Sequence, residues 1–150
     1  DIDDAQGRYR ESDMFLSGDE IKVFPTPYGN VGLTICYDLR FPYLFDRLRK
    51  AGADIISVVA AFTETTGKAH WQPLLQARAI EQQCYLLAAN QWGQHDSKRR
   101  TFGHSMVISP WGEVLNQLPS EEGFSCAEID LDEVRRIRRE MPVANHQRNI

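Results

Sequence analysis

The chain has 150 residues, of which 42% are hydrophobic and 25% are charged, a composition typical of one globular domain with a sizeable core. Its net charge of −4, without a long basic run, argues against nucleic acid or an anionic membrane as a partner. No apolar stretch approaches the length of a membrane span. The three cysteines are an odd number at wide spacings without a C-x-x-C pair, which argues against a disulfide framework or a zinc site. Free thiols in a reducing compartment fit better, so a cytoplasmic protein is expected.

The first part of the chain predicts a hairpin followed by a strand-helix-strand crossover. Pro27, Gly29 and Asn30 are turn residues between two short apolar runs, which indicates the hairpin. Pro42 stands where a first helical turn accepts proline. The expected elements are a polar loop at 1–20, strands at 21–25 and 31–36, a helix at 41–50 and a strand at 54–61.

The second part predicts one long helix, a meander of strands and a last helix. Asp130 followed by Glu133 resembles a capping box that opens the last helix. The expected elements are a loop at 62–69, a helix at 69–83, a strand at 85–90, a charged loop at 94–100, strands at 104–109, 113–118 and 124–129, a helix at 131–140 and a polar tail at 141–150. Strands that alternate with helices and then form a meander indicate an α/β fold with a mixed sheet.

Cys36 is the leading candidate for chemistry, because it falls where a strand ends and a helix begins. On such a turn the thiol is lifted out of the sheet toward unpaired backbone N–H groups, and both features favour a thiolate. The alternative is that Cys36 is simply the last buried residue of its strand, since free cysteine is often buried. Tyr37, Asp38 and Arg40 place polar groups directly after the thiol, at the sheet edge where α/β proteins bind small molecules.

The string C-Y-D-L-R-F-P at 36–42 resembles the nucleophile motif of the nitrilase superfamily, in particular its Nit-type amidase branch. Further matching strings follow in order, at 61–71, 77–81, 103–105, 110–114 and 129–131. The resemblance implies an αββα sandwich in which two sheets pack face to face, with residues 1–150 as the C-terminal part of a single carbon-nitrogen hydrolase domain. The chain starts without Met on an acidic, turn-like segment and therefore reads as a fragment.

The resemblance also assigns roles to individual residues. Enzymes of the family use a Cys nucleophile, a Glu and a Lys, with a second Glu near the substrate. The string R-E-S matches the second Glu to Glu11, whereas the first Glu and the Lys belong to segments before Asp1. The backbone N–H of Tyr37 is expected to stabilise the oxyanion.

Three further residues are candidates for substrate contacts. The planar guanidinium of Arg40 could bind a substrate carboxylate through two hydrogen bonds. Alternatively, it could form a structural ion pair with Asp38 or with a carboxylate on a helix. Phe62 and Thr63 follow the end of the strand at 54–61, and the loop at 62–69 is the best candidate to face the substrate.

Two rival assignments stay open on the sequence. His70 or His104 could serve as the base of a Cys-His enzyme, although neither cysteine-protease signature surrounds Cys36. Glu81 could be taken for a catalytic acid, but its spacing from Arg78 favours an ion pair on one helix face.

The family implies hydrolysis of a small linear amide, deaminated glutathione-like or an ω-amide of a dicarboxylic acid, through a cysteine thioester. The same acyl chemistry would serve a nitrilase or an N-carbamoyl amidohydrolase of the same superfamily. A non-enzymatic alternative is a truncated binding module without catalytic activity. No cofactor and no metal is expected. Beyond its small-molecule substrate, a homodimer or higher homo-oligomer is the partner that the family implies.

Overall fold

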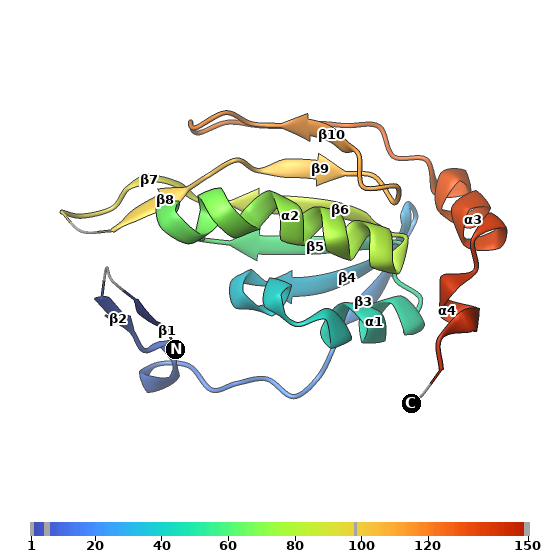
Figure 1. Cartoon of the computed structure of the whole chain (residues 1–150), viewed down its shortest axis with the longest axis horizontal. Helices are drawn as coiled ribbons and strands as arrows, with labels where there is room; N and C mark the ends of the chain where they lie inside the picture. The colour runs from blue at the N-terminus through green and yellow to red at the C-terminus, as the bar shows by residue number, and fades with distance from the viewer. Residues whose placement is uncertain (1, 5–6, 98, 149–150) are drawn as a thin grey trace.

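The computed structural model describes residues 2–4, 7–97 and 99–148. Its centre is a six-stranded mixed sheet in the order β10-β9-β6-β5-β4-β3 (Figure 1). Strands β4, β5 and β6 are parallel. Strand β3 pairs antiparallel with β4, β9 pairs antiparallel with β6, and β10 pairs antiparallel with β9. The sheet strands are β3 (Val23–Thr26), β4 (Gly29–Ile35), β5 (Ile55–Ala60), β6 (Tyr85–Asn90), β9 (Met106–Ile108) and β10 (Val114–Gln117). The α/β fold with a mixed sheet is therefore confirmed.

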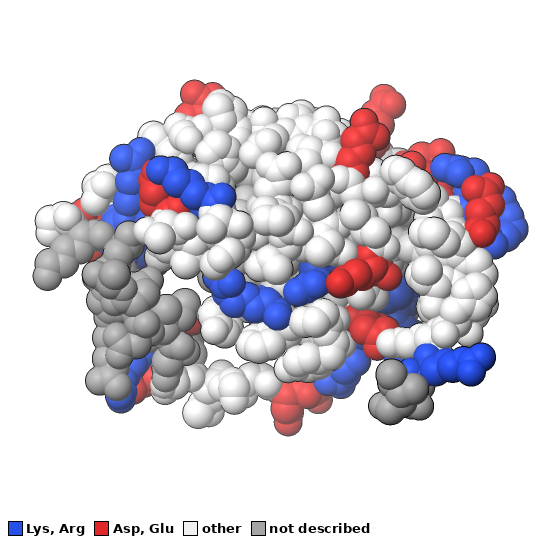
Figure 2. Space-filling model, in the orientation of Figure 1, with Lys and Arg blue, Asp and Glu red and all other residues white. Residues whose placement is uncertain are grey.

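Two helices, α1 (Pro42–Lys50) and α2 (Glu64–Gln82), cover one face of this sheet (Figure 1). Alternate residues of the central strands point into that layer, as the period of a strand requires. The resulting core has fully buried members from both helices and from β5, β6 and β9, among them Phe45, Trp71, Ile56, Leu86 and Ile108. Figure 2 shows that this face is largely uncharged over the middle of α2. Charges of both signs lie toward the ends of the face and in a row below the α2 region in that view.

The other face of the sheet is only partly covered. Helix α3 (Leu131–Glu140) packs Val134 against Ile55 and Tyr85 at one end of it. Farther along, Leu33, Ile35 and Val59 are 46%, 66% and 48% exposed. A stripe of apolar strand residues therefore lies open on this face.

Arg138 fixes α3 to the amino-terminal edge of the parallel strands. Its guanidinium donates to the Asp54 carboxylate at 2.9 Å, to the Ala53 carbonyl at 2.7 Å and to the Cys84 sulfur at 3.2 Å. Burial raises the pKa of the Cys84 thiol to about 11, so this cysteine is protonated at neutral pH. The cluster is structural, and it lies at the sheet edge opposite to the carboxyl ends of the strands.

The remaining elements are short. The structure has no helix, among those it describes, that is long and apolar enough to cross a membrane. The short elements are β1 (Ile2–Asp4), β2 (Gly7–Tyr9), the 3-10 helices η1 (Glu11–Asp13) and η2 (Cys36–Arg40), β7 (Trp92–Gln94), β8 (Arg100–Phe102) and α4 (Val143–His146).

Several predicted boundaries were wrong, and each error has a physical cause. The loop at 62–69 is mostly the first turns of α2, because the Thr63 side chain caps the helix and Gly67 lets Phe102 pack directly against it. A Cβ at Gly67 would stand only 2.3 Å from the Phe102 side chain. The helix therefore starts at Glu64 rather than near 69.

Other differences lie in the second half. The described residues 95–97 and 99 form the predicted charged loop, but the sequence did not predict the short strands β7 and β8 that flank it and pair as a hairpin. The predicted strand at 124–129 is irregular, and the Asn116 side chain holds it by donating to the Cys126 carbonyl at 2.7 Å. Asp130 does cap α3, but Glu133 accepts a hydrogen bond from the Tyr85 hydroxyl, so the capping box is incomplete.

Candidate active site

Cys36 stands on a tight elbow between β4 and α1. Its φ of 47° lies in the left-handed region that favours glycine, and it opens the 3-10 helix η2 before Pro42 begins α1. The Asp38 carboxylate accepts a hydrogen bond from the Ile35 N–H at 2.9 Å and so closes the turn. The backbone therefore turns sharply at the thiol, as the sequence predicts.

Arg78 of α2 forms a hydrogen bond to the backbone of the elbow. This residue is 5% exposed, and its Nε donates to the Leu39 carbonyl in η2 at 3.2 Å. Its Nη1 pairs with Glu81 at 3.0 Å, and its guanidinium lies 5.6 Å from the Phe45 ring centre. The predicted Arg78–Glu81 ion pair is confirmed, and Arg78 also links α2, α1 and the elbow.

A cleft of about 530 Å³ lies at the carboxyl ends of β4, β5 and β6. Parallel strands bring their carboxyl ends to one edge, where small molecules bind in α/β folds. Its lining includes Cys36, Glu11, Ala61, Asn90 and Ser105. The structure thus brings Glu11 to the same cleft as Cys36, although 25 positions separate them in the sequence.

Burial dominates the electrostatics of the thiol and raises the pKa of Cys36 above its ordinary value. Hydrogen bonds from the backbone of Ala61 and Tyr37 lower this pKa, as does the charge of Arg40, whereas the charge of Glu11 raises it. Because a thiolate accepts hydrogen bonds, these backbone groups favour its formation. The thiol is therefore mainly protonated until a base removes its proton.

The other predicted side chains lie around the elbow. The Arg40 guanidinium lies 5.5 Å from the centre of the Tyr37 ring and 5.2 Å from that of the Phe62 ring. Phe62 is buried against Trp71, and Thr63 caps α2. Arg40, Phe62 and Thr63 do not line the cleft within the part of the chain that the structure describes, and their contact with substrate stays a prediction.

Both histidines of the rival assignment are engaged elsewhere. The Nδ1 of His70 lies 3.3 Å from the Arg40 guanidinium. The His104 ring is held between Gln117, at 3.2 Å from Nδ1, and Ser120, at 3.0 Å from Nε2. These contacts favour the structural role over that of a base for Cys36.

The sequence did not reveal Ala61, Asn90 and Ser105 as cleft residues. Ala61 acts on the thiol through its backbone, which carries no sequence signature. Asn90 and Ser105 come together because β6 and β9 pair, and the Asn90 N–H donates to the Ser105 hydroxyl at 3.0 Å. The one available signal was a polar residue at the end of an apolar strand.

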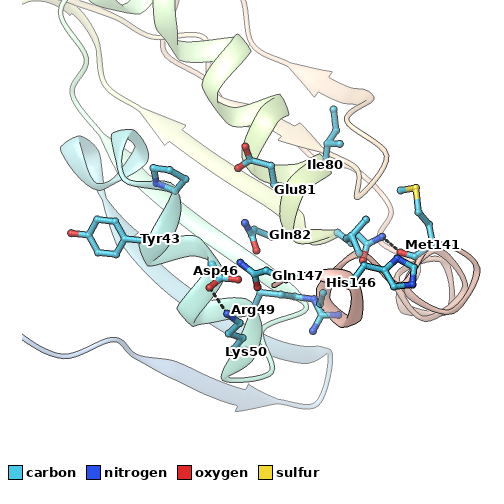
Figure 3. A pocket seen from close by; sticks show the side chains of 14 residues that line it. Tyr43, Asp46, Arg49, Lys50, Ile80, Glu81, Gln82, Met141, His146 and Gln147 are labelled. Atoms are coloured by element: carbon cyan, nitrogen blue, oxygen red, sulfur yellow. Dashed lines mark hydrogen bonds and ion pairs between the residues drawn. The ribbon is translucent and has the colours of Figure 1, made fainter. Parts of the chain in front are cut away.

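A second groove, of about 660 Å³, lies between α1, α2 and α4 (Figure 3). Its lining contains no cysteine, and two of its charged side chains, Asp46 and Lys50, pair with each other at 2.7 Å. Among the described residues, no group of three or more His, Cys, Asp and Glu is arranged to hold a metal ion. The smaller cleft, which holds the thiol, is therefore the candidate active site.

The chain belongs to the carbon-nitrogen hydrolase family, whose sequence profile matches residues 2–139. It is 51% identical over 148 residues to a deaminated glutathione amidase of Yersinia enterocolitica, covering 99% of this chain and 52% of the relative. The crystal structure of the Caenorhabditis elegans NitFhit protein superposes with a TM-score of 0.91 at 48% identity, covering 96% of this chain and 35% of that one.

An amidase from Nesterenkonia sp. AN1 is a more distant neighbour, with a TM-score of 0.70 at 28% identity over 89% of this chain and 52% of that one. In that structure acrylamide has undergone Michael addition at the active site cysteine. The nitrilase-like fold is thus confirmed, and the chain spans about half the length of the curated relatives it matches.

The electrostatics of the cleft predict how Glu11 acts on the thiol. Replacing Glu11→Gln removes a negative charge that opposes thiolate formation, so the pH midpoint of Cys36 alkylation by iodoacetamide should fall. Because Glu11 is exposed, added salt should shrink the difference. The rate is followed by mass spectrometry of the Cys36 peptide in the complete protein, and Glu140→Gln is the control. An unchanged or raised midpoint would contradict the prediction.

Proposed function

We propose that the complete protein hydrolyses a small linear amide through a thioester on Cys36. The observation that carries this proposal is the thiol on its strained elbow, in a cleft that Glu11 also lines. Backbone hydrogen bonds from Tyr37 and Ala61 lower the pKa of this thiol. The relatives named deaminated glutathione amidase support the substrate class, and the adduct at the active site cysteine of the Nesterenkonia amidase supports the nucleophile.

In the proposed reaction the Cys36 thiol loses its proton to a base and the thiolate attacks the amide carbonyl. The tetrahedral oxyanion accepts a hydrogen bond from the Tyr37 N–H. An acid protonates the nitrogen, the C–N bond breaks, and ammonia leaves the thioester behind. Water then attacks the thioester, releases the carboxylic acid and returns the thiol. One amide and one water give one acid and one ammonia.

Glu11 contributes a carboxylate to this cleft, and we assign it the family's second Glu, which acts near the substrate. The same family pattern supplies the first Glu and the Lys from a segment outside this chain. This division explains how the thiol can have a raised pKa and still react, since the proton acceptor comes from elsewhere in the domain.

The nucleophile assignment predicts opposite effects at two cysteines. Cys36→Ala in the complete protein should leave the fold intact and abolish ammonia release, as the roughly 10⁶-fold loss on removing a hydrolase nucleophile suggests. Cys84 is fully buried and its Sγ lies 3.2 Å from the Ala53 carbonyl, so Cys84→Ala should lower the free energy of unfolding by about 1 kcal/mol and leave the rate nearly unchanged. Most of the activity surviving in Cys36→Ala would exclude this nucleophile.

We further propose that residues 1–150 form the C-terminal part of one carbon-nitrogen hydrolase domain. Two observations support this: the chain spans about half of its relatives, and the apolar stripe formed by Leu33, Ile35 and Val59 lies open on the sheet. A second sheet packed on that face would complete an αββα sandwich.

The three free cysteines support a cytoplasmic location for the complete protein.

The domain proposal predicts that the isolated 150-residue chain is inactive. Losing an oxyanion donor reduces a rate by roughly 10² to 10³, and losing acid-base help by about 10² to 10⁴, so together they place turnover below detection. The exposed apolar stripe should also make the chain aggregate, which light scattering would detect. Ammonia release from short ω-amides at the rate of the complete protein would show that the acid-base residues lie within this chain.

We also propose that the complete protein forms a homodimer or a higher homo-oligomer. The helical face is largely uncharged over α2 (Figure 2). Tyr43 on α1, Ile80 on α2 and Trp111 are 63%, 48% and 64% exposed. The groove between α1, α2 and α4 would accept part of a second copy (Figure 3). The predicted result in sedimentation velocity is therefore an oligomer at micromolar concentration, and a monomer there would refute self-association.

A further inference from the structure

Asn90 is the last residue of β6, and both the oxygen and the nitrogen of its side-chain amide form hydrogen bonds. The residue is 7% exposed and lines the cleft that contains Cys36. Its Oδ1 accepts a hydrogen bond from the Phe62 N–H at 2.9 Å, and its Nδ2 donates to the Gly103 carbonyl at 2.7 Å. The side chain therefore joins the chain that leaves β5 to the turn before β9.

Asn90 binds the N–H of Phe62, which directly follows Ala61, and Ala61 lines the cleft together with Cys36. Strand β5 ends at Ala60, whose carbonyl accepts the last ladder hydrogen bond from the Gln91 N–H at 2.9 Å. Ala61 follows and lines the cleft together with Cys36, whose pKa its backbone lowers by hydrogen bonding. Phe62 comes next, and its N–H donates to the Asn90 Oδ1. The two hydrogen bonds fix the chain on both sides of Ala61.

We propose that Asn90 is a positioning residue, which holds the Ala61–Phe62 backbone so that the Ala61 N–H stays aligned on the Cys36 sulfur. Geometry gives it this role, because the two peptides have left the sheet and the Asn90 amide replaces the missing strand partner. The Phe62 carbonyl, which accepts from the Phe102 N–H at 2.9 Å, completes the support from the other side. The effect on turnover rests on the function proposed above, whereas the effect on the thiol does not.

The test compares Asn90→Ala with wild type in the complete protein, by alkylation of Cys36 with iodoacetamide across a pH series. Losing alignment of an N–H donor destabilises the thiolate, so the alkylation midpoint should move to higher pH. Glu11 and Arg40 are the charged groups that act on this thiol, and both are unchanged in the variant. In an amide hydrolysis assay kcat should fall by about 10²-fold with a smaller change in KM, as expected for a misplaced catalytic group.

Asn30→Ala is the matched control. Its Nδ2 also donates to a backbone carbonyl, that of Gly52 at 3.0 Å, but near the opposite ends of the parallel strands. It should lose stability without moving the alkylation midpoint. If Asn90→Ala likewise lowers only the free energy of unfolding and keeps the wild-type midpoint, the positioning role is overturned.

Asn90→Ser serves where the alanine variant fails to fold, because a hydroxyl keeps a polar group in the buried site but is too short to span from Phe62 to Gly103. The same upward shift is expected, and an unchanged midpoint again overturns the proposal. A wild-type protein that releases no ammonia from any amide would refute the proposed function. The alkylation series would still decide the role of Asn90.

Discussion

The buried guanidinium of Arg78 is the interaction on which the arrangement of this chain depends. A charge at 5% exposure is tolerable only when it is paired and hydrogen-bonded, and Arg78 satisfies this through Glu81 and the Leu39 carbonyl. Because these partners lie on α2 and on the elbow, neutralising the charge fixes one against the other. The Phe45 ring beneath the guanidinium adds α1 to the same contact. The position of the nucleophile thus follows from an electrostatic requirement of the core.

The two edges of the parallel strands have separate tasks. At the amino-terminal edge, Arg138 joins α3 to Asp54 and Cys84, and the thiol there is buried and protonated. At the carboxyl edge, the cleft leaves Cys36 open to a small molecule, with backbone donors beside it. The same residue type is therefore inert at one edge and available at the other, as burial and local hydrogen bonding dictate.

The sequence predicted the parallel core well, because continuous apolar runs with turn residues between them have few alternatives. The strand at 85–90 was placed at its observed bounds, and the elbow at Cys36 was expected. The start of α2 was missed, since its cause is the packing of Phe102 on Gly67, a contact made across the fold. Asn90 was missed for a similar reason, because its role appears only when β5, β6 and the chain before β9 lie together.

The left-handed backbone at Cys36 sets stability against reactivity at this position. A residue with a Cβ at a φ of 47° carries roughly 1 kcal/mol or more of strain, which glycine would relieve. The most stable residue for this turn is thus one that has no thiol and performs no chemistry. A design that optimises only the free energy of unfolding would therefore favour Cys36→Gly, which removes the thiol. Position 36 must be held fixed in any such design.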